Sequence, residues 1–249
     1  MRGGRRRARG IVLGAALLGV VLVAPPRAET QSFVEDFADG RLDPARWERT
    51  VAGDFREWSA DVVEVGRPGP PRFRLRLRAD TRGTRDDTVK YLGVRGVQPI
   101  ALREGMRISV QLDWADQANG SYLTGAIVVS PHVTRHNPLD TADWLQVAYV
   151  GVPPGRNARM VVGLKTAGRE RTVHTEGWPE VNRGGRPVAA QEITLRIRDR
   201  SLEVWEGRQR IWASTSDELA FGAVYLYLQM SSHSNYPARS IYFDRIRVD

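Results

Sequence analysis

The chain has no cysteine in its 249 residues, and only two of its basic residues, Lys90 and Lys165, are lysines. The absence of cysteine excludes disulfide bonds, thiolate metal sites and a cysteine nucleophile. A domain of this size can bury a sufficient apolar core without disulfides. The fold is therefore expected to depend on packing rather than on covalent cross-links.

The sequence also lacks an apolar run long enough for a membrane-spanning helix. The run Ile11–Ala24 has 14 residues, whereas a spanning helix needs about 20. Arginines precede this run, and small residues and prolines follow it, which predicts a signal peptide over residues 1–28. We expect one mature domain over residues 29–249, exported to the periplasm or the cell exterior, with no membrane span after cleavage. An uncleaved N-terminal anchor is the alternative.

Little net charge remains once the signal is set aside. The whole chain carries 37 basic and 29 acidic residues, a formal charge of +8. Residues 1–28 hold six arginines and no acid, so 31 basic residues against 29 acidic ones remain, a charge of +2. A strongly basic chain would suggest a nucleic-acid partner, but here most of the excess belongs to the signal. We expect no nucleic-acid partner, and we expect the mature domain to be a monomer.

The mature chain shows no long stretch with helical periodicity, and its dominant pattern is period-two alternation. Phe73, Leu75 and Leu77 alternate with arginines, which predicts a strand with one buried face and one solvated face. Turn residues separate such segments, so the pattern predicts an all-β, two-sheet antiparallel β-sandwich. Asp43 is expected to cap one helical turn. The expected strands are Arg72–Arg78, Met106–Asp113, Ser121–Ser130, Trp144–Val150, Arg159–Lys165, Glu192–Arg198, Ser201–Trp205, Arg208–Ser214, Gly222–Met230 and Ser240–Val248.

The two ends of the mature chain carry a family pattern. The first end reads Phe33-Val-Glu-Asp-Phe-Ala-Asp-Gly-Arg-Leu-Asp-Pro-Ala-Arg-Trp47, and the second reads Arg239-Ser-Ile-Tyr-Phe-Asp-Arg-Ile-Arg-Val248. These segments resemble the termini of bacterial members of the concanavalin A-like lectin/glucanase superfamily. The resemblance implies a jelly roll whose N- and C-terminal strands lie side by side, which removes two loose strand edges. Phe33, Phe37, Tyr242 and Ile246 are then expected to pack together.

The resemblance does not extend to a catalytic motif. Family 16 glycoside hydrolases of this superfamily carry E-x-D-x-(x)-E on one strand of a concave face, so that one carboxylate attacks and another donates a proton. The nearest fragments here, Asp61–Glu64 and Glu203–Glu206, place their carboxylates on opposite strand faces. The R-x-E-x-R, Q-x-H and Y-x-K-x-G patterns of alginate lyases are absent too.

Aromatic and amide side chains favour glycan binding on the concave face. Tyr225, Tyr227 and Gln229 share one strand face. Aromatic faces stack on sugar rings, and amides bond hydroxyl groups; the competing interpretation is that the rings fill the core. The predicted carbohydrate-binding residues are Trp144, Gln146, Arg159, Trp178, Tyr225, Tyr227 and Gln229. Strand arginines at positions 74, 76, 196 and 198 suggest an acidic polysaccharide or, alternatively, an ordinary solvated face.

Acid/base and metal candidates are fewer. His174 and Glu176 face the same side of an extended segment and could act as a general acid/base pair, or the segment is a solvated loop. Asp113 and His233 are weaker catalytic candidates. The histidines lack the ligand spacing of a zinc site. The resemblance allows a structural calcium ion near the paired termini, with Asp36, Asp39 and Asp244 as the matching acids; ordinary turn carboxylates are the alternative, and no other cofactor is implied.

Three functional hypotheses remain from the sequence. The first is an exported carbohydrate-binding or interaction module that contacts a glycan on its concave face. The second is a glycoside hydrolase or polysaccharide lyase with an atypical acid/base set. The third is a structural envelope domain without a small ligand. The missing carboxylate motif favours the first hypothesis over the second, and the aromatic face favours it over the third.

Overall fold

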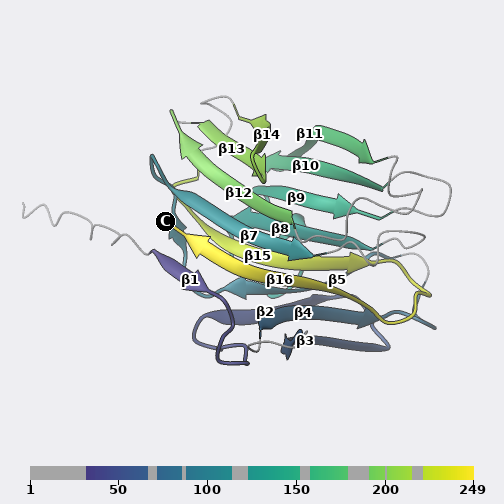
Figure 1. Cartoon of the computed structure of the whole chain (residues 1–249). Coiled ribbons are helices and arrows are strands. Elements are labelled where there is room, and N and C mark those ends of the chain that lie inside the picture. Colours follow the sequence, from purple (N-terminus) through teal and green to yellow (C-terminus); the bar gives the residue numbers. More distant parts are fainter. Residues whose placement is uncertain are drawn as a thin grey trace, which may run out of the picture.

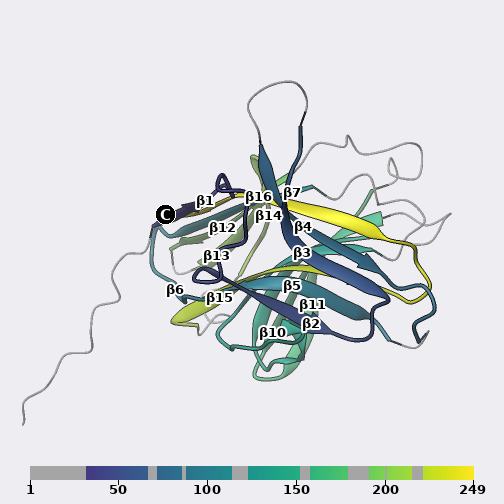
Figure 2. The same ribbon diagram turned by 90° about the horizontal axis from the view of Figure 1, so that it is seen from below.

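The computed structural model describes residues 32–66, 72–85, 88–113, 123–151, 158–178, 191–199, 201–214 and 221–249. Its strands form two antiparallel sheets of eight strands each (Figure 1), and Figure 2 shows the two layers from below. Two sheets laid face to face bury the side chains between them, which confirms the expected all-β jelly-roll sandwich. Within this described part of the chain, no helix has the length and hydrophobicity to cross a membrane.

Sheet A contains, in spatial order, β14 (Gln209–Ala213), β13 (Ser201–Glu206), β12 (Gln191–Arg198), β7 (Arg107–Asp113), β16 (Arg239–Val248), β4 (Phe73–Asp80) and β3 (Glu57–Glu64), and β1 (Phe33–Glu35) also pairs with β16. Sheet B contains β11 (Arg169–Trp178), β10 (Ala158–Thr166), β9 (Trp144–Val150), β8 (Thr124–Ser130), β15 (Ala223–Ser232), β5 (Lys90–Gly96) and β2 (Trp47–Ala52), and β6 (Ile100–Ala101) pairs with β15. Neighbours in space are often distant in sequence, so the chain repeatedly crosses between the sheets.

Every expected strand overlaps an observed one, and the predicted turn is present, because the Asp43 carboxylate accepts a hydrogen bond from Ala45 N at 2.9 Å. Five strands were not predicted: β2, β3, β5, β6 and β11. In β5 the signal was present, since Leu92 and Val94 face the core and alternate with Tyr91 and Arg95. The segment around His174 lies in β11 and not in a loop.

The core lies between the sheets and is built by the alternation seen in the sequence. In β4, Leu75 and Leu77 are fully buried, and burying each such side chain stabilises the fold by about 2 kcal/mol. The arginines of the same strand face outward and meet carboxylates: Arg74 pairs with Asp113 at 2.7 Å, and Arg76 pairs with Asp61 at 2.8 Å. Paired arginines neutralise this face, so they favour the structural interpretation over binding of an acidic polysaccharide.

Two further strand arginines also have partners on the outer face of sheet A. The guanidinium of Arg196 lies 4.6 Å from the centre of the Trp205 ring, and Arg198 lies 3.6 Å from a carboxylate oxygen of Asp199. Neither arrangement is a site built for an anionic polymer.

The chain ends are paired as the resemblance implied. Phe33 lies opposite Val248, and Glu35 lies opposite Ile246. Phe37 and Ile246 belong to the core, but the expected contact with Tyr242 is wrong, because Phe243 faces the core instead. The cause is a register shift between Asp244 and Arg247: such a bulge reverses which residues face inward along the rest of the strand.

Candidate functional site

The face of sheet B turned away from the core is the candidate site, and we call it the open face of sheet B. Strand register aligns its side chains in rows that cross the sheet. One row, which we call the covered row, joins directly opposed residues that are all buried: Thr50, Gly93, Gln229, Ala126 and Ala148. Gly93 is required there, since a Cβ would lie 2.5 Å from the Leu228 carbonyl oxygen. Because these residues are buried although they face away from the second sheet, another part of the chain must cover them.

The cover is the segment between β8 and β9, residues 131–143, which we call the strap. It runs outward across the open face to the edge strand β2, where Val51 N donates to Arg135 O at 2.9 Å and His136 Nδ1 lies 3.2 Å from Val51 O. Arg135 pairs with Glu48 at 2.6 Å. The strap then returns through a 3₁₀ turn, Pro138–Asp140, capped by Asn137. It closes on itself where His132 Nε2 meets Asp143 Oδ2 at 2.9 Å.

Three of the predicted sugar-binding side chains hold this strap. The hydroxyl of Tyr227 donates to His132 O at 2.7 Å and accepts from Thr134 N at 3.1 Å. Gln229 Nε2 donates to Asn137 Oδ1 at 3.0 Å, and Trp144 Nε1 donates to Leu139 O at 2.9 Å.

All three side chains are 2% exposed or less. They lie on the expected face, but the expectation of an accessible platform needs correction for them. The rings do not fill the core either; they are buried beneath the strap. Burial is also the main cause of the raised pKa of Tyr227.

The other predicted sugar-binding residues differ in accessibility. Gln146 and Tyr225 are half-buried, and Arg95 stacks over the Tyr225 ring at 5.1 Å. Arg159 is exposed on β10. Trp178 is the last residue of β11, and its side chain lies outside the described part of the chain.

The neighbouring row of the open face consists of partly buried and exposed residues, and we call it the open row. It joins directly opposed residues across seven strands: Ala52, Tyr91, Ser231, Thr124, Val150, Arg159 and Gly177. The first five are half-buried, and Arg159 is exposed. The open row is thus a shallow strip that runs along the strap and spans the whole width of the sheet.

Three of the catalytic candidates, Asp113, His174 and His233, lie apart from one another. Asp113 lies on the outer face of sheet A, paired with Arg74. His174 is opposite Val162 in the β10–β11 ladder, on the core side of the strand, and the Glu176 side chain lies outside the described residues. His233 follows β15 and its pKa is lowered by burial and then by the charge of Lys90. An acid/base pair of His174 with Asp113 or His233 is therefore not assembled.

The calcium candidates are also separate. Asp36 accepts from Ala38 N, Asp39 pairs with Arg41 at 3.1 Å, and Asp244 pairs with Arg72 at 2.5 Å. In the portion of the chain that the structure describes, no group of three His, Cys, Asp or Glu side chains could hold a metal ion. Asp36 and Asp39 lie in the segment after β1, and Asp244 is a buried ion-pair partner in the central strand β16.

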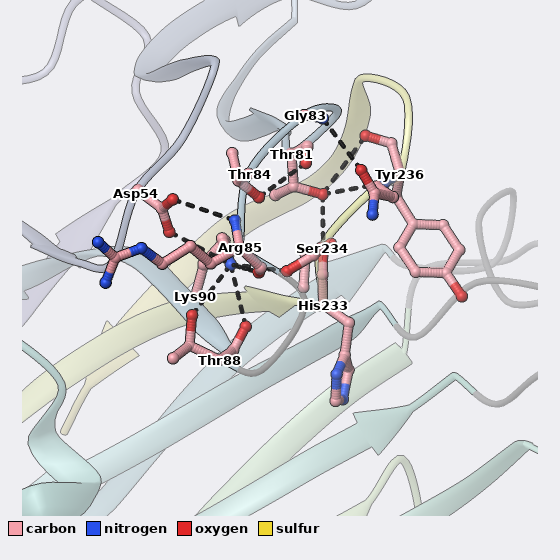
Figure 3. A network of polar contacts seen from close by, with 12 residues as sticks. Asp54, Thr81, Gly83, Thr84, Arg85, Thr88, Lys90, His233, Ser234 and Tyr236 are labelled. Carbon is pink, nitrogen blue, oxygen red and sulfur yellow. Dashed lines mark hydrogen bonds and ion pairs between the residues drawn. The ribbon is translucent and has the colours of Figure 1, made fainter.

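Sequence reasoning missed a second polar assembly, at the end of the open row beside β5. Lys90 is fully buried, and its ammonium is surrounded by oxygens (Figure 3): Arg85 O at 2.9 Å, Thr88 O at 3.0 Å, Thr88 Oγ1 at 3.1 Å, Ser234 Oγ at 2.9 Å and Asp54 Oδ1 at 3.3 Å. A buried ammonium is tolerated only with such partners. The cage binds together three loops that border the open row. The sequence signal for this cage was Lys90, a lysine directly before the alternating apolar residues Leu92 and Val94.

The two sheets, their paired termini and the face opposite the core define a concanavalin A-like jelly roll. Solved structures with this fold include the catalytic domain of an endo-1,3-β-glucanase (laminarinase) from Thermotoga petrophila RKU-1, with a TM-score of 0.59 and 16% identity over 87% of this chain and 95% of that one. A β-glucanase from Bacillus licheniformis has a TM-score of 0.53 and 13% identity over 87% and 97%. The LamA catalytic domain from Zobellia galactanivorans has a TM-score of 0.57 and 12% identity over 88% and 97%.

No protein-family model matches the sequence, and no curated protein matches it. At these identities the likeness to the glucanases establishes the fold alone, and the functional argument rests on this chain's own residues.

Proposed function

We propose that the protein is an exported, non-hydrolytic carbohydrate-binding domain that holds a glycan along the open row of sheet B. The observation that carries the proposal is the row itself, in which directly opposed, partly exposed residues cross seven strands beside the strap. An extended glycan needs a long, shallow strip with hydroxyl, aromatic and charged groups rather than a deep apolar pocket. Tyr91, Ser231, Thr124 and Arg159 supply those groups.

The arrangement of carboxylates supports binding without cleavage. Glycosidases need two carboxyl groups, about 5–5.5 Å apart in retaining enzymes and about 6.5–9.5 Å apart in inverting ones. None of the open-row residues carries a carboxyl group, and neither does any residue of β9, Trp144–Val150. The row itself supplies neither nucleophile nor proton donor. Two acids, Asp54 and Asp140, lie at its β2–β5 end. The bonds from Arg85 N and Lys90 lower the pKa of Asp54 and keep it ionised, so it is not a proton donor for that mechanism.

The choice of glycan starts from the structural neighbours. Those neighbours include a laminarinase and a β-1,3-1,4-glucanase (lichenase). We infer that a β-glucan is the first ligand class to test on this chain. A neighbour described as an endo-acting O-glycanase for mucin makes mucin O-glycans the second class.

The proposed location follows from the N-terminal sequence. Residues 1–28 are proposed to be removed on export, which leaves residues 29–249 as a monomeric domain in the periplasm or outside the cell, where polysaccharides are present. Intact-mass analysis of the exported protein tests this directly. We expect a species that begins near residue 29, and a species that retains residues 1–28 would contradict cleavage.

Affinity gel electrophoresis in laminarin, mixed-linkage β-glucan and mucin, together with a reducing-sugar assay, tests the function. We expect one of these glycans to retard the protein and no reducing ends to form. Replacement of the exposed open-row residue by Arg159→Ala should weaken retardation several-fold, whereas Arg78→Ala on the outer face of sheet A should not. Release of reducing ends would favour glycan cleavage instead, and absence of both retardation and release would favour a structural envelope domain.

A further inference from the structure

A cleft of about 740 Å³ lies at the β2–β5 end of the open row. This volume is within the range of about 300–1,000 Å³ that is typical of ligand sites. Its lining combines residues of the row, the strap and the loops around Lys90: Ala52, Gly53, Asp54, Arg85, Thr88, Val89, Tyr91, Asn137 and Asp140. At this cleft the open row is bordered on one side by the strap and on the other by the loops around Lys90.

Tyr91 supplies the aromatic part of this cleft. It lies on the open row between Ala52 and Ser231 and is half-buried. Burial raises its pKa, and the negative charges of Asp140 and Glu170 add to the effect. Like any tyrosine hydroxyl at neutral pH, that of Tyr91 is protonated and can donate a hydrogen bond as well as accept one.

Both walls are fixed in place before any ligand binds. On one side, Asp54 is held by Arg85 N at 3.3 Å and by the caged Lys90 at 3.3 Å. On the other, Asn137 bonds Gln229 at 3.0 Å and Asp140 at 3.1 Å. Groups held this way lose little conformational entropy when a ligand binds. This reduced entropy cost is the main way in which preorganisation raises binding affinity.

The chemistry of the lining selects one ligand class. A tyrosine ring presents a face to the apolar side of a pyranose, and two carboxylates and an amide accept and donate hydrogen bonds to its hydroxyl groups. The lining carries the guanidinium of Arg85 as well as the carboxylates of Asp54 and Asp140, and Asp54 is paired with Lys90, so its charges nearly balance and favour a neutral ligand. A neutral sugar satisfies all of these groups.

We propose that this cleft is a subsite for one neutral pyranose unit of the bound glycan, with Tyr91 as its platform and Asp54 and Asp140 as its hydroxyl acceptors. This subsite rests on the proposed function. It adds where one sugar unit of the glycan binds and that this unit is a neutral pyranose. The rest of the open row, including Arg159, binds the neighbouring units.

The test is calorimetric titration of laminarihexaose and of a mixed-linkage β-glucan hexasaccharide into the full mature protein and its variants. Tyr91→Leu removes the ring and is expected to weaken binding at least about tenfold, whereas Tyr91→Phe keeps the ring and should retain most of the affinity. Asp140→Asn, at an exposed position, is expected to weaken binding several-fold. The matched control is Tyr242→Leu, a half-buried tyrosine on the outer face of sheet A, which should leave the affinity unchanged.

The outcomes separate this inference from the proposed function. Loss of binding in both Arg159→Ala and Tyr91→Leu, with recovery in Tyr91→Phe, supports both. Loss in Arg159→Ala with no effect of Tyr91→Leu and Asp140→Asn overturns the subsite and leaves glycan binding along the row intact. Absence of binding of both hexasaccharides to the unmutated protein overturns the subsite, and affinity electrophoresis in mucin then decides the broader function. Thermal unfolding of each variant identifies any loss that comes from misfolding.

Discussion

At the residue scale, Tyr227 shows how one side chain changes the interpretation of a whole face. Its ring lies on the open face of sheet B, but its hydroxyl both donates to and accepts from the strap backbone. A buried hydroxyl that loses its partners costs free energy, as do the backbone groups left behind. The ring therefore belongs to the support of the strap and not to a surface for sugars.

Tyr227→Phe keeps the ring and removes only the hydroxyl. Because Thr134 N and His132 O then lose a buried partner, we expect the free energy of unfolding to fall by about 1–3 kcal/mol. Urea unfolding monitored by tryptophan fluorescence measures this change. Tyr242→Phe on the opposite sheet is the control, and an equal loss in both variants would contradict a specific role of Tyr227.

The lysine cage gives a second test at this scale. Lys90→Met leaves the loop oxygens and Asp54 without their cation, and breaking a buried charge arrangement typically costs about 3–5 kcal/mol. We expect a loss toward the lower end of this range, because Asp54 is half-exposed. Lys165→Met is the matched control, since that ammonium makes one longer bond, to Leu139 O at 3.3 Å. Equal unfolding midpoints for the two variants would contradict the account of the cage.

The ionised carboxylate of Asp80 makes the free energy of unfolding depend on pH in the acid range. Its bonds to the Arg82 side chain lower its pKa from 3.8 to about 2, so the folded state binds fewer protons than the unfolded state between these values. This stabilisation is fully present above the unfolded pKa and is lost as the pH falls through the folded pKa. Since Arg82 is about half-exposed, solvent screening reduces the contribution to about 1 kcal/mol.

Asp80→Asn should therefore lower the free energy of unfolding at neutral pH by that amount and have little effect near pH 2. Urea unfolding across this pH range, compared with Asp39→Asn at an exposed turn, measures the difference. A loss that persists unchanged at the lowest pH would contradict the assignment to the ionised carboxylate.

At the scale of elements, most strands could be predicted and the strap could not. Strands such as β9 are encoded locally, because alternation of apolar and polar residues fixes which face is buried. The strap is held by contacts between distant parts of the chain: Thr134 N bonds the hydroxyl of a tyrosine 93 residues away. No local pattern predicts such a contact, so Trp144 and Gln229 were placed on the correct face and assigned the wrong accessibility.

The unexpected orientation of Tyr242, which faces away from the core, also depends on contacts between distant parts of the chain. A bulge near Asp244 depends on how β16 meets β7, and the sequence of β16 alone does not show it. The open row was partly predictable, since Arg159 was selected from the sequence. Tyr91 was missed because β5 contains two glycines, which weaken its strand pattern.

The strap is predicted to be a rigid wall. The amide of Thr134 bonds a buried hydroxyl, and the amide of Val51 bonds the strap carbonyl of Arg135. Amides held this way open only with large parts of the fold. Hydrogen–deuterium exchange should show protection of Thr134 comparable to that of β9, while Val133 at the exposed top exchanges quickly. Rapid exchange of Thr134 would contradict a fixed wall.

At the scale of the whole molecule, the sandwich separates its two outer faces by chemistry. The outer face of sheet A carries arginines paired with acids, such as Arg76 with Asp61, and is neutralised. On the open face of sheet B the strap covers the row of Gln229, and the open row beside it ends in the Tyr91 cleft. The account assigns the glycan to that row and to no other part of the surface.

The most direct test of this assignment is nuclear magnetic resonance mapping of the mature protein titrated with laminarihexaose and then with a mixed-linkage β-glucan hexasaccharide. If the glycan lies on the open row, one of these ligands will shift backbone amides at Tyr91, Thr124, Ser231 and Arg159 and leave β4 and β16 on sheet A unchanged. Shifts confined to sheet A, or no shifts with either ligand, would contradict this assignment.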